Sequence, residues 1–220
     1  MRPRHEDEGE LGVDIVLPEI NQYLHAMTPE RDPILKEMEA LGARDGFPLV
    51  GPLVGRFLYQ MTIIARAQRV FEMGSGFGYS AYWFAAAMAQ GGQVICTDTS
   101  EDRLRYARAF FTRAGLEDRI VCKVGNALDI LRTEPGPFDI IFNDIDKQDY
   151  PQAFRLAMEK LRPGGILITD NVLWSGEVLA EDPDAETKAI LEFNDLIYRT
   201  EGVFSTIVPL RDGLSISLKL

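Results

Sequence analysis

Residues 138–150 read Phe-Asp-Ile-Ile-Phe-Asn-Asp-Ile-Asp-Lys-Gln-Asp-Tyr. Apolar residues lead here into several carboxylates and one lysine, which is the pattern of a buried parallel strand that carries charged side chains at its carboxyl end. Residues 165–171, Gly-Ile-Leu-Ile-Thr-Asp-Asn, repeat this pattern. If the two strands are neighbours, Asp144, Asp170 and Asn171 meet around one point. Two carboxylates and one amide oxygen suit a hard divalent cation such as Mg²⁺.

The segments around these two stretches alternate between strand and helix patterns. We predict strands at 69–73, 93–97, 120–124, 138–142 and 165–169, and helices at 53–65, 79–89, 101–114, 127–131 and 151–161. Such alternation favours right-handed crossovers, a mostly parallel sheet and ligands beyond the carboxyl ends of the strands. A helix at 186–198 and strands at 203–208 and 214–218 follow. The Arg-Asp-Gly turn between the last two strands predicts a hairpin, so the sheet is expected to end with an antiparallel strand.

The amino-terminal part has a different character. Residues 1–12 look like a charged tail, and residues 18–27 show a short helical pattern. A second helix is predicted to begin with Pro33 in its first turn and to stop at Gly42 and Gly46. Together these helices are expected to cover one side of the molecule.

Length and composition bound the organisation of the chain. With 220 residues, of which 46% are hydrophobic, the chain can bury one α/β core. We expect a single domain over residues 1–220, with residues 1–46 as tail and helical cover and residues 47–220 as the catalytic core. The net charge of −11 disfavours a wide grip on nucleic-acid phosphates, although it leaves room for a local basic patch.

Neither a signal peptide nor an apolar run near the ~20 residues of a membrane span is recognisable, so a cytoplasmic protein without membrane contact is expected. Cys96 and Cys122 lie in separate strand patterns, where a free thiol behaves as a small buried hydrophobe, and we expect no disulfide. His5 and His25 lie too far toward the amino terminus to anchor a catalytic triad, and no role is assigned to them.

A nucleotide site is indicated by residues 70–80, Val-Phe-Glu-Met-Gly-Ser-Gly-Phe-Gly-Tyr-Ser, which run from a strand through a glycine-rich turn into a helix. Glycines allow close approach of a ligand to the backbone, and the helix amino terminus offers free N–H groups. A dinucleotide fingerprint would need a third glycine where Tyr79 stands. Asp98, at the end of the next strand, can accept both hydroxyls of a ribose, whichever nucleoside carries it.

These motifs, together with Gly125-Asn-Ala127, Asp144-Ile-Asp-Lys147 and Asp170-Asn-Val-Leu-Trp-Ser-Gly176, resemble the cation-dependent O-methyltransferases. That family uses S-adenosylmethionine and includes catechol and caffeoyl-coenzyme A O-methyltransferases. The resemblance, which spans residues 49–220, implies a Rossmann-like class I methyltransferase fold: a seven-stranded, mostly parallel sheet with an antiparallel last strand and helices on both faces. Relatives are often dimers, so a homodimer is expected.

The resemblance also implies roles for individual residues. Mg²⁺, or Ca²⁺ or Mn²⁺ in its place, would be held by Asp144, Asp170 and Asn171, and Lys147 would be the catalytic base. The implied contacts to S-adenosylmethionine are Val50, Glu72, Gly74, Ser75, Ser80, Asp98, Ala127 and Asp146.

The chemistry favours a small catechol-type acceptor, that is, a vicinal diol. A phenol titrates near ~10, and a dication beside it stabilises the anion, while a second hydroxyl can chelate the ion. The dication should disfavour the ammonium form of Lys147, which could then accept the hydroxyl proton. Trp174 is expected to line the site. Ser175 stands where the plant coenzyme A ester branch has a substrate-binding asparagine, and the acidic segment 177–186 would repel coenzyme phosphates, so such esters are disfavoured.

Three alternatives stay open at this point. Some bacterial relatives that resemble this chain methylate a 5-hydroxyuridine at the wobble position of transfer RNA, a substrate that the acidity of the chain disfavours without excluding it. A nicotinamide oxidoreductase would share Asp98, but Tyr79 opposes it. A protein that binds a nucleoside without turnover is opposed by the intact set of Asp144, Asp170, Asn171 and Lys147.

Overall fold

The computed structural model describes residues 15–220. Its core is a seven-stranded sheet with the strand order β3-β2-β1-β4-β5-β7-β6. The strands are β1 (Arg69–Met73), β2 (Gln93–Asp98), β3 (Ile120–Val124), β4 (Phe138–Asn143), β5 (Leu161–Thr169), β6 (Val203–Val208) and β7 (Leu214–Lys219). β1 to β5 pair in parallel, whereas β7 lies antiparallel to both β5 and β6. The predicted mostly parallel sheet with an antiparallel last strand is confirmed.

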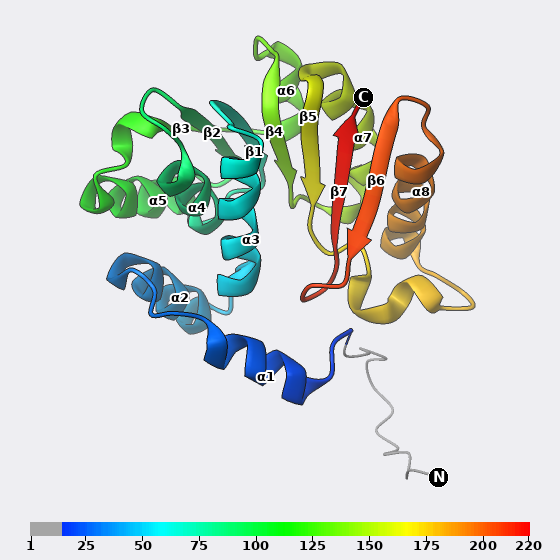
Figure 1. Ribbon diagram of the computed structural model, residues 1–220, viewed down its shortest axis with the longest axis horizontal. Coiled ribbons are helices and arrows are strands. Elements are labelled where there is room, and N and C mark those ends of the chain that lie inside the picture. The colour runs from blue at the N-terminus through cyan, green and yellow to red at the C-terminus, as the bar shows by residue number, and fades with distance from the viewer. Residues whose placement is uncertain (1–14) are drawn as a thin grey trace.

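Helices cover both faces of the sheet (Figure 1). One face carries α3 (Gly51–Ile64), α4 (Tyr79–Ala87) and α5 (Glu101–Ala114), and the other carries α6 (Ala127–Thr133), α7 (Tyr150–Lys160) and α8 (Ala185–Arg199). Alternate residues of β4 serve the two faces, as the pleat of a strand requires. Ile140 and Phe142 belong to the core cluster under α3 to α5, while Ile141 between them belongs to the cluster under α6 to α8. Phe138 also belongs to the second cluster, because the ladder is irregular between Phe138 and Ile140.

Most predicted boundaries lie within two residues of those observed, but two were wrong. α2 (Pro33–Asp45) continues through Gly42 and ends at Gly46, whose φ of 62° is a left-handed helix cap. Gly42 instead allows a close approach of the chain, because a Cβ there would lie 3.0 Å from the carbonyl oxygen of Phe47. β5 begins at Leu161 rather than at residue 165, since Leu161 pairs with Phe138 ahead of an irregularity in the ladder.

The amino-terminal helices lie beyond the carboxyl ends of the parallel strands, at the bottom of the view in Figure 1. α2 is anchored there by the buried side chains of Leu35 and Met38. α1 (Pro18–Met27) has no buried residue, so it forms a looser cover than α2. The charged tail predicted for residues 1–12, with His5, lies outside the described residues.

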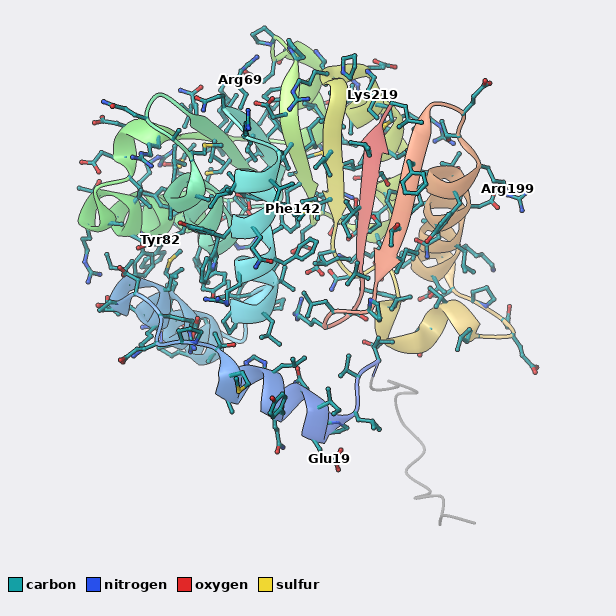
Figure 2. The ribbon with its side chains drawn as sticks, viewed as in Figure 1. Glu19, Arg69, Tyr82, Phe142, Arg199 and Lys219 are labelled. Atoms are coloured by element: carbon teal, nitrogen blue, oxygen red, sulfur yellow. The ribbon has the colours of Figure 1, made fainter. Side chains whose placement is uncertain are left out.

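The opposite end of the sheet is closed by structural hydrogen bonds. Arg69 donates to the carbonyl oxygens of Pro135 and Pro137, and Lys219 donates to those of Met158 and Leu161. Figure 2 shows Arg69 and Lys219 at the end of the sheet away from Glu19 of α1. Any ligand site of this fold is therefore to be sought at the α1 and α2 end. No helix within residues 15–220 has both the length and the apolar character needed to cross a membrane.

The contact between α3 and α4 depends on a glycine. A Cβ added at Gly55 would lie 2.2 Å from Nε1 of Trp83, a side chain that is only 9% exposed. Alanine is the better helix former by about 1 kcal/mol, but overpacking of a core costs roughly 1–3 kcal/mol. The steric cost should dominate, because the indole ring has little room to move.

We therefore predict that Gly55→Ala lowers the free energy of unfolding by about 1–2 kcal/mol, measured by urea denaturation. In the background of Trp83→Leu, which removes the indole ring, the same substitution should be neutral or stabilising. A rise in stability on Gly55→Ala alone would show that the two helices do not meet through this glycine.

Candidate active site

The ends of β4 and β5 bring the three predicted oxygen donors together. Asn143 and Thr169 are partners in the parallel ladder, so the residues that follow them, Asp144 and Asp170, leave the sheet side by side. The backbone N–H of Asp170 donates to the carbonyl oxygen of Asn143 at 3.1 Å. Asn171 follows with a φ of 60°, a left-handed conformation that turns the chain sharply after β5.

Lys147 lies at the centre of this group, in the short 3₁₀ helix η2 (Lys147–Asp149). Its Nζ donates to Oδ1 of Asp144 at 3.2 Å and to Oδ1 of Asn171 at 2.9 Å. The side chain is held between aromatic rings, with Nζ 4.9 Å from the ring centroid of Tyr150 and 5.5 Å from that of Trp174. One buried cation is therefore shared by two of the three predicted metal ligands.

Among the three predicted metal ligands and Lys147, Asp170 is the most deeply buried, with no exposed surface. Its Oδ2 accepts from Nη1 of Arg211 at 3.0 Å, while its Oδ1 has no hydrogen-bond partner among residues 15–220. Burial raises the pKa of the Asp170 carboxyl, the negative charge of Asp144 adds to this, and Arg211 opposes it. A buried carboxylate oxygen without a partner, beside a second carboxylate, is a place where added positive charge is stabilising.

The chemistry of the donor set therefore fits a hard dication. The set consists of two carboxylates and one amide. No three His, Cys, Asp or Glu side chains come together as a metal site anywhere in the described part of the chain. The amide oxygen of Asn171 is thus an essential third donor if a metal binds here.

Three residues of this neighbourhood were not anticipated from the sequence. The hydroxyl of Tyr150 donates to the carbonyl oxygen of Asp170 at 2.8 Å, beneath Lys147. Arg211 and Asp212 come from the hairpin turn between β6 and β7, which the sequence analysis treated only as a turn. Nδ2 of Asn171 donates to Oδ2 of Asp212 at 3.2 Å. No local signal marks these contacts, because they depend on where β7 lies in the sheet.

A cavity of about 350 Å³ opens beside Asp144 and Lys147, at the ends of β1 and β2. All of the predicted cofactor contacts except Glu72 line it, namely Val50, Gly74, Ser75, Ser80, Asp98, Ala127 and Asp146. Gly74 has a φ of 83°, and a Cβ there would lie 2.2 Å from the carbonyl oxygen of Asp144. Only glycine allows β1 and β4 to approach so closely at the floor of the cavity. We call this space the donor cavity, after the methyl donor whose predicted contacts line it.

Asp98 is oriented by backbone groups on the far side of the donor cavity. Its Oδ2 accepts from the N–H of Gly76 at 3.0 Å and its Oδ1 from the N–H of Ser100 at 2.8 Å. Arg103 approaches Oδ1 at 3.5 Å. Since a carboxylate can accept about four hydrogen bonds, Asp98 retains capacity for hydroxyl groups of a ligand.

Glu72 lies behind the donor cavity and has no exposed surface. Its carboxylate accepts from the hydroxyls of Ser75 and Ser80. Burial raises the pKa of Glu72 to about 7, against the effect of these two hydrogen bonds. Ser75 and Ser80 thus connect the cavity to the carboxyl group of Glu72. The protonation state of this carboxyl group depends on the charges near it.

A second cavity of about 460 Å³ lies beside the turn between β6 and β7, and we call it the acceptor cavity because Ser175, a predicted substrate residue, lines it. Val50 lines both cavities. The acceptor cavity is bordered by the start of α3, by Asn21 and His25 of α1, and by Ser175, Arg211 and Asp212. Of the two predicted substrate residues, Ser175 lines this cavity, whereas Trp174 packs over Lys147. Asp144 and Lys147 line the donor cavity. Arg211 and Asp212, which hydrogen-bond to Asp170 and Asn171, line the acceptor cavity.

Cys96 and Cys122 are neighbours on β2 and β3 and are both free thiols, with their sulfur atoms 3.4 Å apart. They lie away from the four central residues.

Comparison with known proteins identifies the family of this chain. A profile of the O-methyltransferase family matches residues 26–220. The chain is 31% identical over 201 residues to a catechol O-methyltransferase of Niastella koreensis, covering 86% of this chain and 90% of that one. It is 32% identical over 196 residues to a catechol O-methyltransferase of Mycobacterium tuberculosis, covering 87% and 88%. The crystal structure of an O-methyltransferase from Bacillus cereus in complex with SAH superposes with a TM-score of 0.84 at 32% identity, covering 92% of this chain and 97% of that one.

The chain therefore belongs to the O-methyltransferase family, and its relatives and its fold make it an enzyme of the S-adenosylmethionine-dependent class.

The buried carboxyl of Glu72 has a consequence that can be measured without any ligand. Its folded-state pKa of about 7 lies above the ordinary value of 4.5, so the folded protein binds this proton more tightly than the unfolded chain does. The contribution of Glu72 to the free energy of unfolding is then most favourable below pH 4.5, and it is lost as the pH rises through 7. Glu72→Gln removes this dependence.

We predict that the stability of Glu72→Gln relative to wild type, in cofactor-free protein, rises by about 3 kcal/mol between pH 5 and pH 8. Chemical denaturation at a series of pH values measures this difference. The same change at Glu159, which is exposed on α7, is the matched control and should give no comparable slope. If the difference in stability between Glu72→Gln and wild type were the same at pH 5 and pH 8, the raised pKa of Glu72 would be refuted.

Proposed function

We propose that this enzyme transfers the methyl group of S-adenosylmethionine to one hydroxyl of a small vicinal diol of the catechol type, with a divalent cation held by Asp144, Asp170 and Asn171. The observation that carries the proposal is the hydrogen-bonded set of Lys147, Asp144 and Asn171 at the wall of the donor cavity. Arg211 and Asp212, which bond to Asp170 and Asn171, line the acceptor cavity. A methyl transfer needs the acceptor oxygen, the methyl carbon and the sulfur in line, so its two substrates must meet across one boundary.

On the donor side, the glycine turn at residues 74–78 lets the backbone approach the cofactor closely, and Asp98 accepts hydrogen bonds from its ribose. Ser75 and Ser80 present their hydroxyls, backed by Glu72. A positive charge on the bound cofactor would stabilise the ionised form of Glu72, whose pKa burial raises to about 7. The SAH bound to the Bacillus cereus relative, which is the demethylated form of the donor, is consistent with this role.

On the acceptor side, a bound dication would supply positive charge that lowers the pKa of a nearby phenol from its free value near ~10. Lys147 would receive the hydroxyl proton at Nζ, and the sulfonium needs no further activation by the protein. Tyr150 and Trp174 hold the lysine stem and exclude water around Nζ.

The acceptor cavity supports a small substrate. Its volume of about 460 Å³ is typical of sites for small molecules, and its lining combines apolar Val50, Pro52 and Leu53 with a few polar groups. The two relatives named catechol O-methyltransferase support the same acceptor class. The homodimer, the cytoplasmic location and the single domain expected from the sequence stay predictions.

The direct test is a methyl-transfer assay with free catechols, coenzyme A esters and undermodified transfer RNA, each with and without a chelator. We expect activity with free catechols, lost on chelation and restored by Mg²⁺. Asp144→Ala should abolish this metal-stimulated transfer while leaving the melting temperature nearly unchanged, because Asp144 lies at the edge of the core. Transfer to RNA alone, or normal activity of Asp144→Ala at limiting Mg²⁺, would contradict the proposal.

For Lys147, we predict that Lys147→Met lowers kcat by roughly 10²- to 10⁴-fold, the range of a general base, and leaves the affinity for S-adenosylmethionine within a few-fold. Single-turnover kinetics measures the first quantity and calorimetry the second. Methionine keeps the apolar stem between Tyr150 and Trp174, so the packing is retained. Lost cofactor binding with unchanged turnover at saturation would contradict the base role.

A further inference from the structure

The turn between β6 and β7, residues Arg211-Asp212-Gly213, is locked onto the loop that follows β5. The N–H of Val172 donates to the carbonyl oxygen of Gly213 at 3.2 Å, and that of Leu173 donates to the carbonyl oxygen of Asp212 at 3.0 Å. Gly213 has a φ of 85°, and a Cβ there would lie 2.5 Å from Cγ of Leu173. The two segments, about forty residues apart in the chain, therefore behave as one unit beside the oxygen donors.

Asp212 makes two further contacts through its side chain. Its Oδ1 accepts from the N–H of Ser175 at 2.5 Å, and its Oδ2 accepts from Nδ2 of Asn171 at 3.2 Å. On the other side of Asn171, Oδ1 accepts from Nζ of Lys147 at 2.9 Å. A carboxylate can only accept and an ammonium can only donate, so both neighbours require the same orientation of the amide.

We propose that Asp212 is a positioning residue that keeps the amide oxygen of Asn171 turned toward the dication site. This inference rests on the proposed function. A cation bound among the oxygen donors would compete with Nζ of Lys147 for the amide oxygen of Asn171, so Lys147 cannot hold that oxygen in place once the site is filled. Asp212 is then the neighbour that still fixes it. Groups that orient a metal ligand in this way are typically worth about 10- to 100-fold in metal affinity.

Arg211 acts similarly on the neighbouring donor. Its guanidinium engages Oδ2 of Asp170 and leaves Oδ1 without a partner among the described residues. The Arg-Asp pair of a single turn thus contacts both donors supplied by the end of β5. Asp212 gives the sharper test, because Asp→Asn changes one atom and preserves the size of the side chain.

In Asp212→Asn, the side-chain oxygen can still accept from the N–H of Ser175, which keeps the loop in place. The new Nδ2 then faces Nδ2 of Asn171, and two donors cannot pair. Asn171 must turn over and present its nitrogen to the dication site. We expect the affinity for Mg²⁺, measured by calorimetry on the SAH-bound enzyme, to fall about 10- to 100-fold. The affinity for SAH, which binds in the donor cavity, should stay within about two-fold.

The matched control is Asp184→Asn, which removes the same charge from a residue that caps α8 through the N–H of Thr187 at 2.7 Å. Asparagine caps a helix about as well as aspartate does, so both Mg²⁺ affinity and fold should be retained. A loss of Mg²⁺ affinity equal to that of Asp212→Asn would mean that net charge, not orientation, is responsible, and would overturn the proposal.

The double variant Asn171→Asp with Asp212→Asn exchanges donor and acceptor while keeping the net charge and all side-chain sizes. It should bind Mg²⁺ at least as tightly as wild type, since an oxygen again faces the site. This variant also decides the matter if Asp212→Asn alone does not fold. Wild-type affinity in folded Asp212→Asn, or no recovery in the exchange, would overturn the positioning role. Absence of Mg²⁺ binding to the wild-type enzyme would instead refute the metal requirement in the proposed function.

Discussion

The site depends on a constraint of parallel β-structure, which is that adjacent parallel strands end at the same edge of the sheet. Because Asn143 and Thr169 are partners, Asp144 and Asp170 must emerge together, and Asn171 follows within one residue. Lys147 lies among them as a buried cation bound to Asp144 and Asn171. Burial raises the pKa of the Asp170 carboxyl, and the negative charge of Asp144 raises it further, so positive charge at this point is stabilising.

The two cavities follow from the same edge. Gly74 lets the end of β1 lie against Asp144, which opens the donor cavity beside the turn rather than filling it with a side chain. On the other side, α1 and the start of α3 close the acceptor cavity over Ser175 and Arg211. Asp144 lines the donor cavity, and the residues that bond to Asp170 and Asn171 line the acceptor cavity, so under the proposed function the methyl donor and the acceptor would meet at this edge of the sheet.

Much of this could be predicted from sequence because it is local. The alternation of strands and helices, the glycine turn, and the polar residues directly after β4 and β5 are written in consecutive residues, and their convergence follows from the parallel ladder. Asp98 was predicted by the same reasoning and Ala127 by the family resemblance, and both line the donor cavity.

The remainder depends on long-range geometry. Arg211 and Asp212 looked like an ordinary hairpin turn, since nothing in their own segment shows that β7 inserts between β5 and β6 and carries the turn to Asn171. His25 received no role, and the position of α1 beside α3 brings it to the acceptor cavity. Gly42 was taken for a helix stop, whereas the chain that leaves α2 folds back against it at Phe47 and Leu49. In each case the local pattern was compatible with more than one environment.

The most direct test of the central claim is a crystal structure of the enzyme with SAH and Mn²⁺, using the anomalous signal of the metal. The account predicts one anomalous peak with oxygens of Asp144, Asp170 and Asn171 about 2 to 2.6 Å away, and Lys147 displaced from its present partners. SAH would occupy the donor cavity on the Asp98 side. Clear density for SAH with no anomalous peak, and with Asp144 and Asn171 still bonded to Lys147, would contradict it.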